Sequence, residues 1–453
     1  MPTNILNLPS YSVTEFHEED HDYHIKAETR QQIVSCPNCH HIELEGFGRR
    51  EQMIRDLPMH GKRVGLYVNT RRFRCKGCSK TFYERLPDVN AKRLMTSRLV
   101  DWIGQQAVKR TFISLADEVG IVEGTVRLIF KDYVSELEQK VRFETPRWMG
   151  IDEIHLTQYR CVITNVENNT IVDLLHNRNK ETVVKYLSQL QGREKIQYVA
   201  MDMWAPYKDA VNLVLPDAIV VIDKFHVVRM ANDAMEKIRK SLRESLTTKQ
   251  RRGLMHDRFV LLKRESELTD QEALKLSGWV ENYPELGLAY RLKEDFFKIY
   301  DSQSKEEAFS RYAAWEISVT EEIRDAFSDL IKAWRNWQPH ILAYFDHRIT
   351  NAYTESVNSL IRVMVRLGRG YSFEALRAKL LFSESSHKKS QKRPAFERRA
   401  PVSIPSTGRH IAGFKSLVSA NHYQNQVNDE SEELKNYGVD IAMLTRMIEN
   451  GEI

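Results

Sequence analysis

The sequence predicts a multidomain protein in which a small cysteine-held ribbon and a short helical unit precede an α/β core that is interrupted by a mostly helical insertion. Three observations predict this architecture. Two Cys-x-x-Cys pairs lie near the N-terminus, a helix–glycine–helix pattern follows them, and the hydrophobic period later changes from helical to alternating. With 453 residues, the chain is long enough for two to four domains.

The composition is that of a soluble globular protein. Hydrophobic residues make up 42% of the chain and charged residues 28%, which is ordinary for this class. The chain has no run of 18 apolar residues, so no membrane span is expected, and residues 1–20 lack the features of a secretory signal. We therefore expect a protein of the reducing cytoplasm without a disulfide scaffold.

Two basic segments suggest a polyanionic partner. Residues 49–93 hold 13 Lys or Arg against 4 Asp or Glu, and residues 359–399 hold 11 against 3, although the net charge of the chain is only +5. Segregated positive charge favours phosphate binding, because binding releases counterions from the polyanion. Solvated surface charge is the alternative that charge alone leaves open.

The cysteines form two knuckles, Cys36-Pro-Asn-Cys39 and Cys75-Lys-Gly-Cys78. Four thiolates satisfy a closed tetrahedral site, so we expect a zinc ribbon with a structural zinc ion, whereas two unrelated redox pairs are the alternative. Short ribbon strands are expected at 65–68 and 71–74. Cations around the second knuckle are expected to contact DNA phosphates: Arg71, Arg72, Arg74 and Lys76.

Residues 111–133 carry the spacing of a helix-turn-helix. Ala116 allows two helices to approach closely, Gly120 permits a turn with positive φ, and Val126 packs the second helix against the first. This second helix is expected over 123–133, in the position of a recognition helix. An ordinary helical hairpin is the alternative, but the basic ribbon favours DNA binding. The expected DNA contacts are Thr125, Arg127 and Lys131.

After residue 146 the periodicity becomes that of strands. Strands are expected at 147–156, 159–166, 170–176, 196–202 and 218–222, and helices at 180–190 and 204–214. Three strands, a helix, a strand, a helix and a strand follow one another in an RNase H-like core. Cys161 lies in the second strand and is expected to be an inert core residue.

Two acids stand out in this core. Asp152 interrupts the apolar first strand, and Asp202 ends the fourth strand. The first and fourth strands are neighbours in such a core, so the two carboxylates would converge and repel unless a cation lies between them. Oxygen ligands suit Mg²⁺ or Mn²⁺, and a pair of such ions supports phosphoryl transfer. For Asp202 taken alone, solvent exposure or helix capping is the better explanation.

A third acid is expected on an amphipathic helix over 351–366. Glu355 lies on its polar face, with Asn358 and cations one and two turns later, whereas Leu360 is expected on the apolar face. A carboxylate followed by cations fits metal binding beside a DNA phosphate, and surface ion pairing is the alternative. Asp346 is a rival third ligand. The expected DNA contacts here are Arg362, Arg366 and Arg369.

In their shared order these motifs resemble bacterial insertion-sequence transposases of the ISL3 family, within the DDE superfamily. After the knuckles and the helix-turn-helix, the matching pieces are Gly150-Ile151-Asp152-Glu153, Asp202-Met203-Trp204-Ala205-Pro206-Tyr207, Asp223-Lys224-Phe225-His226, Glu355-Ser356-Val357-Asn358 and Arg369-Gly370-Tyr371-Ser372-Phe373. The resemblance implies that Asp152, Asp202 and Glu355 are the catalytic, magnesium-binding triad. It also implies that His226 lies near the scissile phosphate, although a packed or capping histidine is the alternative.

The function that follows is DNA transposition. The ribbon and helix-turn-helix would bind the inverted repeats at the element ends, and the core would cleave phosphodiesters and join the freed 3′-hydroxyls to target DNA. Paired ends suggest a homodimer, working on double-stranded DNA of the bacterial nucleoid. The alternatives are a structure-selective nuclease that never joins strands and a non-catalytic DNA-binding regulator.

Seven domains or segments are expected. They are an N-terminal segment (1–30), the zinc ribbon (31–90), the helix-turn-helix (91–142), the first part of the core (147–226), the helical insertion (227–345), the last part of the core with the catalytic helix (346–384), and a basic linker with a C-terminal helix (385–453). Four tryptophans of the insertion are expected in its core rather than at DNA: Trp279, Trp315, Trp334 and Trp337.

Overall fold

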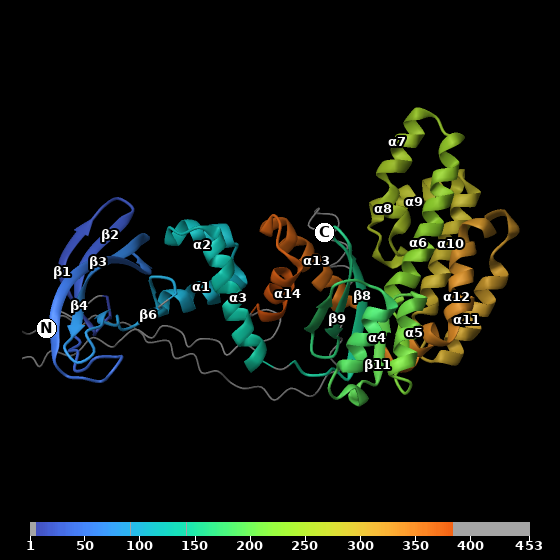
Figure 1. The fold of residues 1–453 in the computed structure, drawn as a ribbon. Coiled ribbons are helices and arrows are strands. Elements are labelled where there is room, and N and C mark those ends of the chain that lie inside the picture. Colours follow the sequence, from blue (N-terminus) through green and yellow to red (C-terminus); the bar gives the residue numbers. More distant parts are fainter. Residues whose placement is uncertain (1–5, 91, 142, 384–453) are drawn as a thin grey trace, which may run out of the picture. The chain divides into compact units, whose positions relative to one another are not determined.

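The structure is a computed structural model that describes residues 6–90, 92–141 and 143–383 (Figure 1). The basic linker and the C-terminal helix expected over 385–453 lie outside the described residues. Within the described part, no helix combines the length and the apolar character that crossing a bilayer requires.

An N-terminal sheet carries the cysteine knuckles. Its hydrogen-bonded order is β1-β2-β4-β3-β7-β6, with β5 paired to β4. The acid- and histidine-rich stretch within 14–24 forms part of the β1–β2 hairpin, and β2 runs parallel to β4. The strands are β1 (Tyr11–Glu18), β2 (Asp22–Thr29), β3 (Leu44–Met59), β4 (Lys62–Cys75), β5 (Thr81–Tyr83), β6 (Val89–Asn90) and β7 (Met95–Thr96).

The ribbon strands are longer than the sequence predicts. The expectation of two short strands at 65–68 and 71–74 is wrong, because both segments lie in the single strand β4, which pairs with β3 along most of its length. Val64, Leu66, Val68 and Thr70 alternate as buried residues on one face of β4, so the alternating burial continues through the expected break at 69–70.

Three helices follow the sheet: α1 (Ser97–Lys109), α2 (Phe112–Val119) and α3 (Glu123–Lys140). The α2 helix ends at Gly120, whose φ of 73° is the left-handed conformation that the spacing predicts. Ala116 and Val126 are buried, as expected. The α3 helix continues to Lys140 instead of ending near 133, because the added residues, Val134 to Lys140, include several good helix formers.

The second sheet has the order β10-β9-β8-β11-β12. The β8 strand is antiparallel to β9 and parallel to β11. The adjacency expected for the first and fourth strands, β8 and β11, is therefore confirmed, and every strand lies within two residues of its expected bounds. These strands are β8 (Trp148–His155), β9 (Tyr159–Asn165), β10 (Thr170–Leu175), β11 (Tyr198–Met201) and β12 (Ile219–Ile222).

Helices connect and extend this sheet. After α4 (Lys180–Gln189) and α5 (Ala205–Val214) come α6 (Lys224–Ser241), α7 (Thr248–His256), α8 (Arg258–Leu262), α9 (Asp270–Asn282), α10 (Pro284–Ile299), α11 (Lys305–Ser318) and α12 (Glu321–His347). The mostly helical character expected for residues 227–345 is confirmed, because α6 to α12 cover most of this range. Trp315, Trp334 and Trp337 are buried in its core and Trp279 packs against it, which agrees with their expected structural role.

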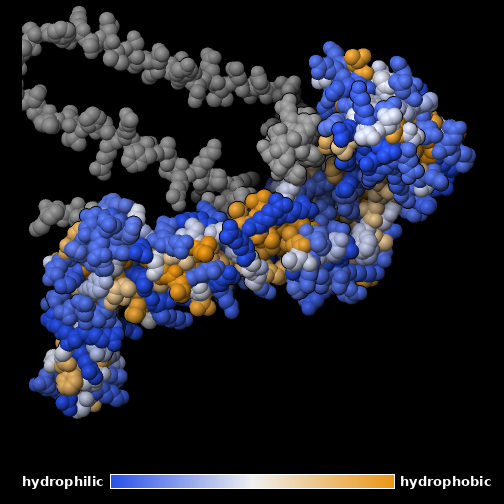
Figure 2. Space-filling view, turned by 90° about the horizontal axis from the view of Figure 1, so that it is seen from above, coloured by the Kyte–Doolittle hydropathy of each residue, from blue (hydrophilic) through white to orange (hydrophobic). Residues whose placement is uncertain are grey.

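The chain then returns to the second sheet through α13 (Ala352–Gly368) and α14 (Phe373–Phe382), with α13 against β8 and β9 and α14 against β10. The expected faces of α13 need correction, because Asn358 is buried whereas Leu360 is 39% exposed. In the second half of α13, Met364 and Val365 are half-buried against the apolar cluster that contains Ile154 and Val162, whereas Val363 and Leu367 are exposed. Figure 2 shows several apolar patches within a largely hydrophilic surface.

Candidate active site and metal centre

Two predicted acids lie side by side at the centre of the second sheet. The parallel register of β8 and β11 pairs Ile151 with Met201. The next residue of β8 is Asp152, and Asp202 directly follows the end of β11. Asp152 is only 4% exposed, whereas the Asp202 side chain is 21% exposed. The convergence predicted from the strand order thus follows directly from the observed register.

The third acid, Glu355, comes from the first turn of α13. Polar contacts anchor this turn to the sheet: Asn351 Nδ2 donates to the Ile151 carbonyl at 3.2 Å, and the hydroxyls of Thr354 and Thr164 are 2.6 Å apart. These contacts fix the turn that carries Glu355 against the strand that carries Asp152.

Asn358, one turn after Glu355, contacts the site directly. Its Nδ2 donates to Asp152 Oδ2 at 2.7 Å and to the Glu153 carbonyl at 3.3 Å. The Glu153 N–H donates to the other oxygen, Asp152 Oδ1, at 2.7 Å. Both oxygens of Asp152 are therefore oriented. Sequence reasoning placed Asn358 beside arginines on a polar surface, and only its i+3 spacing from Glu355 signals this position.

His226 lies among the same acids. Its Nδ1 is 2.8 Å from Asp202 Oδ1 and 3.8 Å from Asp223 Oδ2. Asp223 is buried and caps α6, and its carboxylate, His226 and Glu355 have ligand atoms within 4.8 Å of one another. The structure thus brings the predicted His226 together with the carboxylates and adds Asp223 to the cluster.

Burial and neighbouring charges shift the pKa values of the clustered acids and of His226. Burial and then the Asp202 carboxylate raise the pKa of Asp152 to about 8. Burial and then Asp223 raise the pKa of Glu355 to about 7. Burial lowers the pKa of His226, but contacts with Asp202 and Asp223 outweigh it and raise that pKa to about 10. The acids therefore need positive charge nearby to ionise together.

The donor set fits a hard divalent cation. Carboxylate oxygens suit Mg²⁺ and Mn²⁺, and the buried Asn358 Oδ1 has no hydrogen-bond partner among the described residues. The rival ligand Asp346 does not join this set, because it is exposed at the end of α12, with its Oδ2 3.7 Å from Lys305 Nζ.

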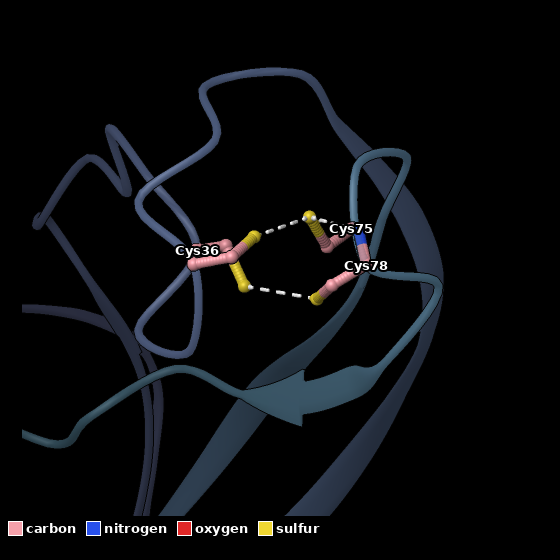
Figure 3. A group of neighbouring side chains, drawn as sticks. Cys36, Cys75 and Cys78 are labelled. Carbon is pink, nitrogen blue, oxygen red and sulfur yellow. Dashed lines mark hydrogen bonds between the residues drawn. The ribbon is translucent and has the colours of Figure 1, made fainter.

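The four knuckle cysteines come together at the end of β4, with their sulfur atoms within 4.8 Å of one another. Figure 3 labels Cys36, Cys75 and Cys78 in this group. Sγ–Sγ distances are 3.8 Å for Cys36–Cys78 and 3.5 Å for Cys39–Cys75, close to the edge of about 3.8 Å of a tetrahedron with zinc–sulfur bonds near 2.3 Å. Burial raises the pKa of Cys36, but backbone N–H donors and the neighbouring thiols lower it to about 6. The thiolate is the metal-binding form, so the arrangement fits zinc.

The predicted DNA contacts on the ribbon differ in availability. The Arg71 guanidinium is 2.7 Å from the buried carboxylate of Glu84, which gives it a structural role, and its phosphate contact stays a prediction. Arg72 packs near the rings of Phe47 and Tyr83 and is half-buried. Arg74 and Lys76 are exposed.

On the helices, Lys131 is exposed, Thr125 is half-buried, and Arg127 pairs with Glu123 at 2.7 Å. Arg362, Arg366 and Arg369 are exposed on and just after α13, on the helix that also supplies Glu355. Cys161 is buried in β9, and burial raises the pKa of its thiol to about 12, which fits the inert residue expected there.

A sheet with four converging thiols, joined to an α/β core with clustered carboxylates, defines a protein that combines structural zinc with divalent-metal chemistry. Residues 149–380, just over half of the chain, match the model of the ISL3-type DDE transposases. Residues 32–78 match the zinc finger of the transposases of IS204, IS1001, IS1096 and IS1165. The chain therefore belongs to the ISL3 family of DDE transposases.

Two curated relatives of this chain are also transposases of insertion sequences. The chain is 23% identical over 347 residues to the transposase for insertion sequence element IS1001 of Bordetella parapertussis, covering 75% of this chain and 86% of that protein. It is 25% identical over 321 residues to the transposase for IS1557 of Mycobacterium tuberculosis, covering 64% and 71%. The protein is thus a DNA transposase that uses a divalent metal, and its ribbon holds structural zinc.

Proposed function

We propose that Asp152, Asp202 and Glu355 are the catalytic carboxylates of this transposase and hold its Mg²⁺ or Mn²⁺ ions. The observation that carries the assignment is the Asn358–Asp152 hydrogen bond, because it docks the helix of Glu355 onto the strand beside Asp202. Bound at this site, a divalent cation supplies activation of water or a 3′-hydroxyl and stabilisation of the leaving oxygen.

The chain's own residues prepare this site. Asn358 and the Glu153 N–H orient the Asp152 carboxylate, so its oxygens need no reorganisation when a cation or a phosphate arrives. In the metal-free site, the contacts with Asp202 and Asp223 raise the pKa of His226 to about 10, which favours its protonated form near neutral pH. We propose that this imidazolium lies beside the scissile phosphate and offsets part of its charge.

We propose that the ribbon and the unit α2–α3 bind the inverted repeats at the element ends. The proposal assigns zinc to Cys36, Cys39, Cys75 and Cys78, phosphate contacts to the exposed Arg74 and Lys76, and a helix-turn-helix role to α2–α3. The left-handed Gly120 between two packed helices supports that role. Exposed Arg362, Arg366 and Arg369 extend the cationic surface from Glu355 along α13.

The larger organisation is also part of the proposal. The sheet order with β11 between β8 and β12 supports an RNase H-like core, divided by the helical insertion as the expected domain bounds describe. Because two ends must be cut together, we propose that a homodimer binds paired ends on bacterial nucleoid DNA, where it cleaves and transfers strands. Protein mass on end DNA, measured by light scattering, tests the dimer.

The assignment predicts a separation of binding from chemistry. Asp202→Asn is expected to bind end DNA within about threefold of wild type but to lose cleavage, because the carboxylate belongs to the proposed metal site whereas the ribbon and α2–α3 are proposed to bind the end DNA. Asp346→Asn is the matched control and should cleave normally, since Asp346 lies at the solvent-exposed end of α12. Loss of binding together with cleavage in Asp202→Asn contradicts the assignment.

The same assay separates the two alternatives. Wild type is expected to join a cleaved end to plasmid DNA when Mg²⁺ is present. Cleavage of branched DNA without joining would identify a nuclease, and metal-independent binding without cleavage would identify a regulator.

A further inference from the structure

A hollow of about 400 Å³ lies where α4 and α5 begin, next to the proposed catalytic acids. The N–H of Trp204 donates to the Asp202 carbonyl at 2.7 Å, and Arg178 forms an ion pair with Glu153, the residue after Asp152. The hollow thus adjoins the strand ends that carry the two aspartates. Its lining is Arg178, Asn179, Lys180, Glu181, Trp204, Ala205, Pro206 and Asp209.

One wall of the hollow is a flat ring held in place by a cation. The guanidinium carbon of Arg178 is 3.8 Å from the ring centroid of Tyr159 and 4.7 Å from that of Trp204, so it lies against both rings. Glu153 holds the same guanidinium through its ion pair. Trp204 nevertheless remains 39% exposed and lines the hollow. A ring fixed in this way is a platform on which another flat ring can stack.

The charges around the hollow favour a neutral ring over a run of phosphates. Its two cations are matched by two acids, and Lys180 Nζ is 3.3 Å from Asp209. The α4 and α5 helices both begin without a side-chain cap. The first backbone N–H groups of α4, from Lys180 and Glu181, can therefore donate to acceptors on the edge of a base. In α5 only the Ala205 N–H can do so, because Pro206 has no N–H and the Tyr207 N–H donates to the Trp204 carbonyl at 3.1 Å. A stacking wall, balanced charge and open donors together fit a nucleobase.

We propose that this hollow receives one unpaired base of the DNA strand next to the scissile phosphodiester, stacked on Trp204. The inference rests on the proposed function, because the acids beside the hollow are the proposed catalytic ones. Taking a base out of the duplex costs stacking and pairing energy, and stacking on the indole ring returns part of it. The stack therefore holds the strand in the position where the proposed carboxylates can act.

The first test removes the ring from the full-length, zinc-loaded protein. Trp204→Ala is expected to slow cleavage of a paired end about tenfold or more, whereas Trp204→Phe, which keeps a flat ring, should stay within about threefold of wild type. Trp204→Leu keeps apolar bulk without a flat ring and should behave like Trp204→Ala. Phe309→Ala is the control, since it removes a 48%-exposed ring from α11.

The second test removes the base. A single abasic site is moved through each position around the cleavage point, and wild type is compared with Trp204→Ala on every DNA. At one position the two proteins should cleave at the same rate, because no base remains to stack there. Wild-type rates for Trp204→Ala on intact DNA, or the same defect at every abasic position, overturn the inference.

The two proposals fail in different ways. Asp202→Asn should cleave none of these DNAs, with or without a base at any position. If Asp202→Asn cleaves like wild type, the proposed function fails and this inference with it. If Asp202→Asn is inactive and Trp204→Ala is fully active, only the stacking site is wrong.

Discussion

At the scale of single residues, the amide of Asn358 orients the carboxylate around which the site is built. It is buried and donates at 2.7 Å to Asp152 Oδ2, while the Glu153 N–H holds the other oxygen. A carboxylate held on both oxygens keeps its direction when the charge around it changes. Asn358 is thus a positioning residue for Asp152, and it lies one helical turn after Glu355 on α13.

Asn358→Ala is expected to raise the Mg²⁺ concentration for half-maximal cleavage about tenfold or more, since loss of such a partner typically weakens metal affinity by about 10–100-fold. The measurement is a Mg²⁺ titration of cleavage at fixed DNA. Ser356→Ala is the matched control, because its exposed hydroxyl bonds only within α13. An unchanged Mg²⁺ requirement in Asn358→Ala contradicts the positioning role.

The raised pKa of Asp152 predicts a pH effect on the metal-free protein. In the folded chain Asp152 keeps its proton up to about pH 8, whereas in the unfolded chain it releases the proton near pH 3.8. The contribution of Asp152 to the free energy of unfolding is therefore lost as the pH rises from 3.8 to about 8. Asp152→Asn carries no such charge. Without added Mg²⁺, we expect Asp152→Asn to have the higher Tm at pH 8 and to lose this advantage at pH 5. An advantage of equal size at both pH values contradicts the raised pKa.

The two aspartates could be predicted from the sequence, but their partners could not. An acid inside or at the end of an apolar strand conflicts with its surroundings, and that conflict identifies Asp152 and Asp202. Asn358 gives no such signal, because an amide on an amphipathic helix looks like surface until the neighbouring strand is placed. Asp223 was recognised only through a motif, although its carboxylate lies in the cluster.

At the scale of elements, a glycine allows α13 to approach β8. A Cβ at Gly150 would lie 2.5 Å from both Asn351 Oδ1 and Thr164 Oγ1, and 2.6 Å from Thr354 Oγ1. These atoms belong to the contacts that anchor the first turn of α13. Only a residue without a side chain leaves room for them, so Gly150 controls the position of Glu355.

Gly150→Ala is therefore expected to lower the free energy of unfolding by about 1–3 kcal/mol, because the added methyl group overpacks a buried contact. It should also raise the Mg²⁺ concentration needed for half-maximal cleavage, because it displaces Glu355. Chemical denaturation measures the first effect. Gly124→Ala is the control: it lies in α3 with nothing within 4 Å of the new Cβ, and should be neutral or stabilising. Equal effects of the two substitutions contradict the close approach.

The zinc site can be tested at the same scale. Cys75→Ser is expected to lose bound zinc and to weaken binding to end DNA, because one thiolate of the tetrahedral set is missing. Zinc content by mass spectrometry and affinity by fluorescence anisotropy measure both. Cys161→Ala removes a cysteine buried in the other sheet and should keep full zinc. Wild-type DNA affinity after complete chelation of zinc contradicts this prediction.

Helices and strands could be predicted from the sequence where the pattern of apolar residues is unbroken. The strands β8 to β12 are short and largely buried, so apolar runs mark them clearly. The sequence did not predict that β3 and β4 form a long antiparallel pair. Most of β3 is exposed and carries charged residues instead of an alternating apolar pattern. Its length comes from pairing with β4, which is a tertiary property.

At the scale of the whole molecule, α14 contacts helices that lie far away in sequence. The Lys379 ammonium is buried, donates to the Arg110 carbonyl at 2.8 Å, and lies 4.4 Å from the ring centroid of Phe112. Burial, together with Arg127, lowers the pKa of Lys379 to about 7. A contact across more than two hundred residues leaves no local pattern, so the sequence could not predict it.

The central claim is that three distant acids form one metal site. Calorimetric titration of the zinc-loaded protein with Mn²⁺ tests it most directly, using Asp152→Asn, Asp202→Asn and Glu355→Gln beside Asp346→Asn. The account predicts that each of the first three variants binds Mn²⁺ at least about tenfold more weakly than wild type, whereas Asp346→Asn binds normally. Wild-type Mn²⁺ affinity in Glu355→Gln would contradict the claim, because α13 would then supply no ligand.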